Sequence, residues 1–222
     1  MYERHVVLDF EFTSIDQKYV EERKVVKHEI IEIGAVLLDC NYRQISRFCT
    51  YVKPEFSTHV KPSVSKLTGI TDKDLENAPS LKEAIEKMTV WIGTDKRTRV
   101  YSWSDTDLHQ LKNECRLKNI PFPQNMDRWL DFQAVWSKLL CTKQKLSLKN
   151  AVTSANGQFM GAQAHTALYD AMATAELLIL ATVKKTEFDK KTKGIKQLLA
   201  PPKACCTTIG ELYGAQLAKF LV

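Results

Sequence analysis

Residues 6–12, with the sequence Val-Val-Leu-Asp-Phe-Glu-Phe, place two acidic side chains in an otherwise apolar segment. In a β-strand, side chains two positions apart lie on the same face, so Asp9 and Glu11 share one face and residues 6, 8, 10 and 12 occupy the other. Two neighbouring carboxylates that lose hydration repel each other, which is costly in an ordinary buried strand. A divalent cation bound between them removes that cost. The alternative is a half-exposed edge strand with a polar face.

The composition is typical of one globular domain. The chain has 222 residues, of which 44% are hydrophobic, and this excludes extensive disorder. No apolar run approaches the length of a membrane span, and no charged-then-apolar leader precedes the first strand, so we expect a cytoplasmic protein without membrane contact. The six cysteines form no Cys-x-x-Cys pair, which favours reduced thiols. The adjacent Cys205 and Cys206 could be redox-active or part of a plain tail.

The net charge of +6 is unevenly distributed, because lysines gather after residue 183 while the preceding residues are nearly neutral. We expect a domain at 1–187 and a basic C-terminal extension of unknown role at 188–222, with a short helix at 209–221. A basic extension fits a polyanionic partner such as nucleic acid. A solvated lysine-rich helix or linker fits this charge run equally well.

Hydrophobic periodicity predicts an α/β domain. We expect an antiparallel hairpin, formed by strands at 29–38 and 45–52 with a turn near Asn41. The strands that follow alternate with helices, which is typical of a mixed sheet flanked by helices. The charged stretch 14–27 is expected to be a loop. Capping-box spacings begin at Thr71 and Ser80. The other expected strands are at 5–12, 99–103 and 129–131, and the main helices are at 81–92, from 106 or 107, at 132–140, 147–155 and 166–183.

Three further candidates for chemistry lie near element ends. Asp107 follows a strand, where α/β folds gather reactive groups, although a helix N-cap is the structural alternative and Asp105 is a rival. Asp170 lies one turn into an alanine-striped helix, where an acidic residue also suits the helix dipole. His165 precedes that helix, and a neutral imidazole there is either a suitable base for water or an incidental loop residue.

The order of these motifs resembles a known superfamily. The segments that carry the resemblance are Asp-Phe-Glu-Phe-Thr at 9–13, Glu-Ile-Ile-Glu-Ile-Gly-Ala-Val at 29–36, Leu-Thr-Gly-Ile at 67–70, Ser-Trp-x-x-x-Asp ending at Asp107, and His-x4-Asp at 165–170. Over residues 5–183 the chain resembles the DEDDh 3′–5′ exonucleases, which include RNase T and the proofreading (DnaQ-like) subunit of bacterial replicative polymerase. Within them it is most similar to the Eri-1-like exoribonuclease branch.

The resemblance implies an RNase H-like fold with a five-stranded mixed sheet and a metal-dependent nuclease site. Two Mg²⁺ or Mn²⁺ ions would be bound by Asp9, Glu11, Asp107 and Asp170, and His165 would accept a proton from the attacking water. Nucleoside 5′-monophosphates would then leave one at a time from single-stranded or overhanging 3′ ends.

Substrate contacts are also implied only by the resemblance. Phe12 and Thr13 would hold the terminal nucleotide, and Leu67 or Ile70 would press against its base. RNA is favoured on the same ground, while a DNA-directed proofreading or repair exonuclease is the alternative within the enzyme class. A nucleic-acid-binding module that does not cleave is the alternative from another class. The natural substrate, the pathway and the oligomeric state stay open.

Overall fold

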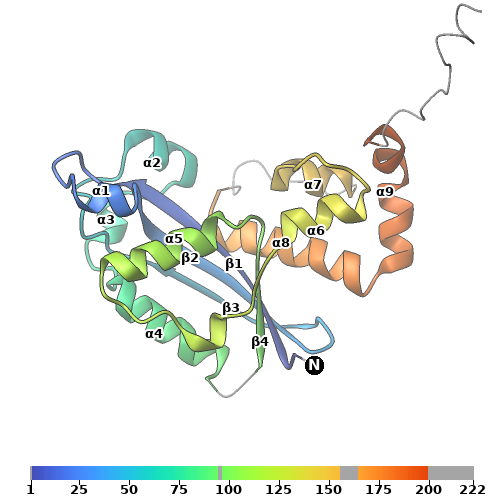
Figure 1. The fold of residues 1–222 in the computed structure, drawn as a ribbon, viewed down its shortest axis with the longest axis horizontal. Coiled ribbons are helices and arrows are strands. Elements are labelled where there is room, and N and C mark those ends of the chain that lie inside the picture. Colours follow the sequence, from blue (N-terminus) through green and yellow to red (C-terminus); the bar gives the residue numbers. More distant parts are fainter. Residues whose placement is uncertain (1, 95–96, 156–164, 200–222) are drawn as a thin grey trace, which may run out of the picture.

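A five-stranded mixed β-sheet forms the centre of the molecule (Figure 1). The computed structural model describes residues 2–94, 97–155 and 165–199 of the chain. The strands lie in the order β3-β2-β1-β4-β5. Strands β1, β2 and β3 pair antiparallel, whereas β4 pairs parallel with both β1 and β5, which confirms the expected sheet and its opening hairpin. The strand bounds are β1 Arg4–Ser14, β2 His28–Asp39, β3 Gln44–Tyr51, β4 Thr98–Ser102 and β5 Trp129–Asp131.

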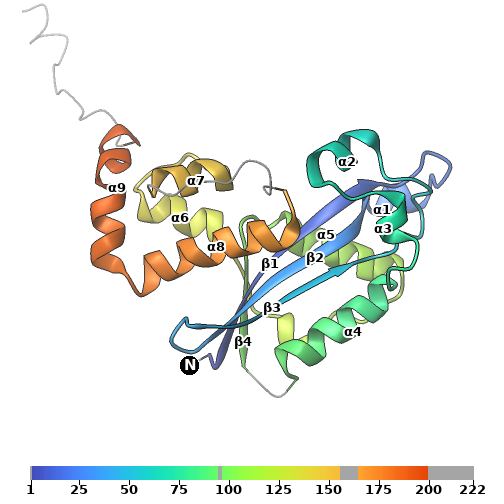
Figure 2. The same cartoon turned by 180° about the vertical axis from the view of Figure 1, so that it is seen from behind.

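Helices cover both faces of the sheet (Figures 1 and 2). Helices α4 and α5 pack on the face that carries Val6, Leu8 and Phe10, and α6, α7 and α8 pack on the face that carries Val7. The alternation along β1 therefore sends successive side chains into two separate cores. The helix bounds are α1 Glu22–Val25, α2 Pro62–Thr68, α3 Asp72–Leu75, α4 Leu81–Ile92, α5 Thr106–Leu117, α6 Phe132–Leu139, α7 Leu148–Ser154, α8 Ala167–Thr182 and α9 Lys185–Leu199, with a 3₁₀ turn at Gln124–Met126.

Helix α8 lies directly on the sheet and crosses β1 and β2 (Figure 1). Ala171 and Ala175 are buried, as the alanine stripe predicts. At the start of the helix the approach is closer still, because a Cβ atom added to Gly34 would lie 2.1 Å from the backbone of Ala167. Only glycine leaves room for the helix backbone at this point of β2.

The helix starts follow local capping chemistry. Both predicted capping boxes are present, at Thr71 with Asp74 and at Ser80 with Glu83. The Thr166 hydroxyl accepts a hydrogen bond from the Tyr169 N–H at 3.3 Å and caps α8 as expected. These short-range signals are readable from the sequence because each involves residues only three positions apart.

The stretch expected to be a loop at 14–27 contains a short helix. Strand β1 continues to Ser14, and α1 occupies Glu22–Val25. The Arg23 guanidinium donates to the carbonyl of Ile15, whose side chain is buried. This contact folds the charged stretch back on itself and stabilises a helical turn that local propensity does not reveal.

The expected boundary between 187 and 188 falls inside α9. Phe188 is buried and packs edge-on against Trp136, with ring centroids 5.4 Å apart, and Thr192 is fully buried. The described part of the extension therefore packs on the domain. The expected helix at 209–221 and the Cys205–Cys206 pair lie outside the described residues. Among the helices that the structure describes, none has both the length and the apolarity to span a bilayer.

Candidate metal centre

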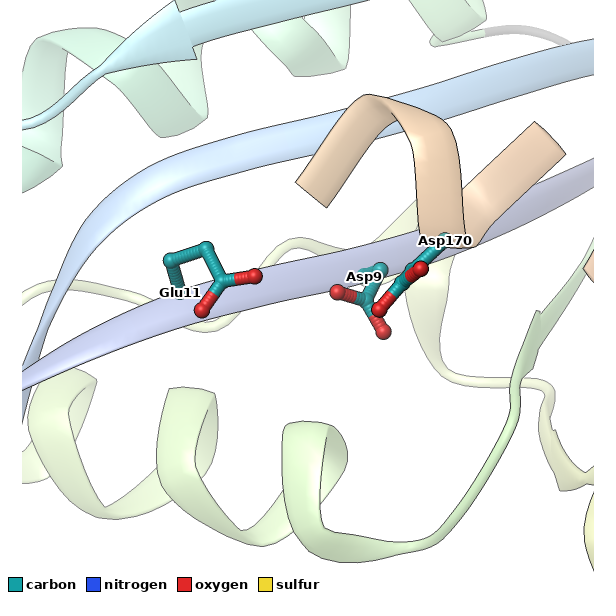
Figure 3. A group of neighbouring side chains, drawn as sticks. All are labelled: Asp9, Glu11 and Asp170. Atoms are coloured by element: carbon teal, nitrogen blue, oxygen red, sulfur yellow. The ribbon is translucent and has the colours of Figure 1, made fainter. Parts of the chain in front are cut away.

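Three carboxylates converge where α8 meets the middle of β1 (Figure 3). Asp9 and Glu11 extend from the same face of β1, and Asp170 reaches them from the first turn of α8. Oxygen atoms of the three carboxylates lie within 4.8 Å of one another. We call these three residues the acidic cluster. The predicted shared face of Asp9 and Glu11 is present, and it is the face covered by α8 rather than an exposed edge.

Asp107 lies beside the acidic cluster but does not belong to the set of carboxylates whose oxygens lie within 4.8 Å of one another. It belongs to the first turn of α5 and is 5% exposed. Its carboxylate accepts hydrogen bonds from the backbone of Phe10 and from its own backbone. Among the neighbouring charges, that of Asp107 acts most strongly on Asp9. The rival, Asp105, is instead an exposed residue paired with His109 at 3.8 Å.

Burial raises the pKa values of all four carboxyl groups, and repulsion from neighbouring carboxylates adds to this effect for Asp9, Glu11 and Asp107. Burial is the largest cause in each case, and the pKa of Asp9 lies well above its ordinary value. The pKa is raised to about 8 for Glu11, to about 7 for Asp107 and to about 6 for Asp170. Among the described residues, the charge of His165 opposes this effect at Asp170, and a bound cation would supply further positive charge to these buried acids.

Asp170 also has an unused ligand atom. Its Oδ1 is buried and has no hydrogen-bond partner among the described residues. A buried carboxylate oxygen without a donor costs free energy unless a cation or proton occupies it. The donors are all carboxylate oxygens, which suit Mg²⁺ or Mn²⁺ better than zinc. The residues present therefore fit divalent cations of this type.

His165 stands at the solvent side of the acidic cluster. Its side chain is exposed, and both its charge and a hydrogen bond from its backbone act to lower the pKa of Asp170 against the larger effect of burial. The backbone of His165 has a φ of 77°, in the left-handed region that is uncommon for residues other than glycine. The residue just before α8 thus has a strained backbone, from which its N–H reaches the Asp170 carboxylate.

A protein-family model described as an exonuclease (RNase_T) matches residues 6–178, which include all five of these residues. The chain belongs to the RNase_T exonuclease family. The fold agrees with this membership. It matches the nuclease domain of 3'hExo, a DEDDh family member solved with bound rAMP, with a TM-score of 0.70 and 22% sequence identity. The match covers 84% of this chain and 94% of that one. Cell-death related nuclease 4 (CRN-4) matches at a TM-score of 0.68 and 20% identity, over 82% and 64%.

Curated relatives of this RNase_T chain carry exonuclease names. ERI1 exoribonuclease 2 of Danio rerio is 29% identical over 78% of this chain and 34% of its own length. The probable 3'-5' exonuclease KapD of Bacillus subtilis is 26% identical over 93% and 91%. Human 3'-5' exoribonuclease 1 is 27% identical over 60% and 39%. The chain spans about a third of the length of the ERI1 exoribonuclease 2 relatives that it matches.

The expected substrate residues differ in accessibility. Leu67, on α2, is 53% exposed, whereas Ile70 is 2% exposed and packs in a small core with Val60 and Leu75. Ile70 therefore lies behind the surface that Leu67 presents. The sequence alone does not predict which of these two apolar side chains is exposed, because that depends on the conformation of the turn between them.

The two expected contacts on β1 are also partly hidden. Phe12 is half-buried against Phe10, with ring centroids 6.4 Å apart. Thr13 is fully buried, and its hydroxyl has no hydrogen-bond partner in the described part of the chain.

Sequence reasoning assigned no role to Glu32, although it lies next to the acidic cluster. It pairs with Glu11 across the β1–β2 ladder and is 4% exposed. The available signal is that Glu32 is the one charged residue in the run 30–38, which is otherwise apolar or glycine.

Proposed function

We propose that this chain is a metal-dependent 3′–5′ exonuclease that acts on single-stranded or overhanging 3′ ends, with RNA preferred over DNA. The observation that carries the proposal is the convergence of Asp9, Glu11 and Asp170, with Asp107 and His165 beside them, in a chain of the RNase_T family. The preference for RNA is supported by the exoribonuclease names of several relatives.

The four acidic side chains would hold two Mg²⁺ or Mn²⁺ ions. Asp9, Glu11 and Asp170 contribute the closest set of oxygens, and Asp107 adds a buried carboxylate next to Asp9. Bound divalent cations supply the positive charge that lowers the pKa of the attacking water and neutralises the scissile phosphate.

His165 acts as the general base in this proposal. Its exposed imidazole accepts a proton from the attacking water at one ring nitrogen, and the nearby Asp170 carboxylate stabilises the imidazolium that results. The water oxygen forms a bond to phosphorus as the bond from phosphorus to the 3′ oxygen breaks, which releases a nucleoside 5′-monophosphate. The leaving 3′ oxygen takes a proton from solvent water and becomes the new 3′-hydroxyl for the next cycle. A positioned base contributes about 10²–10⁴-fold to such a rate.

The proposed nucleotide contacts follow the exposure of the side chains. Leu67 presses against the terminal base, and Ile70 supports α2 from the core. The backbone at Phe12 contacts the terminal sugar, whereas the Thr13 hydroxyl is fully buried and supports the strand from within instead of reaching the nucleotide as expected. Because a terminal base must be unstacked to reach Leu67, single-stranded ends bind better than blunt duplexes.

A cleavage assay tests this function. RNA and DNA oligonucleotides of one sequence, labelled at the 5′ end, are incubated as single strands, blunt duplexes and duplexes with 3′ overhangs, with Mg²⁺, Mn²⁺ or EDTA. We expect ladders that shorten from the 3′ end of single-stranded RNA, that need the metal and that are absent with Asp9→Asn. Faster cleavage of DNA would assign a DNA-directed exonuclease instead. Metal-independent binding without shortening would reject the enzyme.

The cellular compartment is part of the proposal as well. The described cysteines Cys40, Cys49, Cys115 and Cys141 are all free thiols, which suits a reducing compartment such as the cytoplasm. Imaging of the tagged full chain tests this location.

A further inference from the structure

Glu32 is a buried carboxylate placed where it adds to the crowding of negative charge. It is 4% exposed and faces Glu11 on the neighbouring strand. Its charge contributes to raising the pKa values of both Asp9 and Glu11. A carboxylate at this position is therefore unfavourable for the metal-free fold unless it has a separate task.

Both oxygens of Glu32 have hydrogen-bond donors. Oε2 accepts a hydrogen bond from the backbone N–H of Ala167 at 2.9 Å, and Oε1 accepts one from the Cys49 thiol at 3.3 Å. Ala167 is the first residue of α8, where the backbone N–H groups have no partner within the helix. The carboxylate also suits the positive end of the helix dipole. Glu32 thus ties the start of α8 to β2.

The same point of contact is fixed by Gly34. A Cβ atom at Gly34 would overlap the backbone of Ala167, so the helix start rests on the strand itself. Asp170 follows Ala167 by three residues, less than one helical turn. A shift of the helix start therefore displaces the Asp170 carboxylate relative to Asp9 by a similar amount, which matters because ligand sites tolerate only about 0.5 Å of error.

We propose that Glu32 is a positioning residue, which sets the place of Asp170 and His165 by anchoring the first turn of α8 to β2, and that it is not itself a metal ligand. The proposal deepens the proposed function and rests on it only for the catalytic readout. Its structural part concerns the metal-free protein and the binding of Mn²⁺ alone.

Two substitutions separate positioning from ligation. Glu32→Gln keeps a side-chain oxygen that accepts the Ala167 N–H but removes the charge, whereas Glu32→Ala removes the anchor. We expect Glu32→Gln to keep the Mn²⁺ affinity and kcat within about fivefold of the original protein. We expect Glu32→Ala to lose about 10- to 100-fold in both, the usual effect of removing a group that orients a ligand, with KM for a single-stranded oligonucleotide little changed.

Hydrogen exchange in the metal-free protein gives a readout that does not depend on activity. Glu32→Ala should speed exchange of the backbone amides at the start of α8, and Glu32→Gln should not. If the original protein fails to cleave any substrate, the proposed function fails, but this exchange pattern still tests the anchor.

Glu114→Ala is the matched control. Glu114 is also a fully buried glutamate that accepts a backbone N–H, from Ile30 at 3.0 Å, and it lies in α5. Its loss should lower the melting temperature without changing Mn²⁺ affinity.

The proposal is overturned if Glu32→Gln is as impaired as Glu32→Ala, if Glu32→Ala binds Mn²⁺ normally, or if Glu114→Ala loses Mn²⁺ affinity to the same extent. If Glu32→Ala does not fold, Glu32→Gln decides: retained Mn²⁺ affinity supports the anchor, and lost affinity overturns it.

Discussion

Within the acidic cluster, Asp9 is the residue on which the largest number of neighbouring carboxylates act. Burial and the carboxylates of Asp107, Asp170, Glu11 and Glu32 all raise its pKa. The arrangement is unfavourable without a cation, so a site of this kind exchanges fold stability for ligand binding. A substitution that removes the charge of Asp9 should therefore stabilise the metal-free protein and weaken the binding of divalent cations.

Replacing Asp9 by asparagine should abolish cleavage and yet stabilise the metal-free protein. The amide keeps the size of the side chain and removes one of the repelling charges. We expect the melting temperature in EDTA to rise by about 2–5 °C, given about 2–4 °C per kcal/mol for a chain of this size. We also expect the Mn²⁺-induced rise to disappear. A variant that melts lower in EDTA and still gains stability from Mn²⁺ would contradict this account.

His165→Ala tests the general base separately from the metal. Turnover should fall about 10²–10⁴-fold, while the melting temperature and the Mn²⁺ response stay the same, because the imidazole is exposed and supplies no carboxylate oxygen. His59→Ala is the control, since His59 is exposed and pairs with Asp72 away from the acidic cluster. Equal activity of the two variants would remove His165 from the mechanism.

At the scale of elements, the site depends on how closely α8 approaches the sheet. Gly34 permits this approach, and the expected consequence of filling its space is large. Gly34→Ala should destabilise the protein by at least about 1–3 kcal/mol, as overpacking does, and should weaken Mn²⁺ binding by displacing Asp170. Thermal melts with and without Mn²⁺ measure both effects.

Gly194 offers the control for that substitution. It lies in α9, and an added Cβ would meet nothing within 4 Å. Gly194→Ala should therefore stabilise the protein by up to about 1 kcal/mol, because alanine is the better helix former. If both alanine variants had the same effect, close packing of α8 on Gly34 would be excluded as the cause.

A second element-scale feature is a buried ion network that joins α5, β2 and the loop after β3. The Lys118 ammonium lies 2.8 Å from both Glu29 and Glu114, and the side chains are between 0% and 6% exposed. Glu29 also accepts backbone N–H groups from Glu55 and Phe56, so the network holds the loop that leads to α2.

Removing the cation of this network should be costly. Lys118→Met leaves the buried Glu29 and Glu114 carboxylates without a neutralising cation, and we expect a loss of about 3–5 kcal/mol in the free energy of unfolding. Lys112→Met, at an exposed position in α5, should change the free energy of unfolding by less than about 0.5 kcal/mol. Urea denaturation of both variants gives the comparison, and equal stability of the two would show that the network contributes little.

At the scale of the whole molecule, the acidic cluster links stability to pH. The folded pKa values of about 6 for Asp170, 7 for Asp107 and 8 for Glu11 exceed the values of unfolded Asp and Glu, near 4. The folded protein then holds protons that the unfolded chain releases. This contribution to stability is complete below about pH 4 and is lost as the pH rises through the folded values.

In EDTA, these groups should therefore make the melting temperature fall between about pH 4 and pH 8, most steeply below about pH 6 where the folded protein keeps protons that the unfolded chain has lost. Saturating Mg²⁺ should flatten the fall, because the cation replaces the protons. Calorimetric scans across this range provide the measurement, with Glu11→Gln as the variant that should show a smaller slope. A melting temperature that rises with pH in EDTA would contradict the raised pKa values.

The overall fold and the acidic positions could be predicted from the sequence because they depend on short-range patterns. The period of two along β1 places Asp9 and Glu11 together, and the cap at Thr166 places Asp170 one turn into α8. The burial of Phe188 could not be predicted, because lysines surround it in the sequence while its partner, Trp136, lies on another helix.

The role of Glu32 was equally hidden. It depends on the register between β1 and β2 and on a backbone N–H donated by Ala167, 135 residues away. The order of the motifs along the chain shows which acids converge, but contacts such as this one appear only when the tertiary structure places the helix on the strand.

Calorimetric titration of Mn²⁺ into the metal-free protein tests the central claim, that four acidic side chains from β1, α5 and α8 together bind divalent cations. We predict saturable binding at neutral pH, with proton release from the carboxyl groups of raised pKa, and loss of that binding in Asp9→Asn. A folded protein that gives no binding heat, or that binds Mn²⁺ equally well with Asn at position 9, would contradict the account.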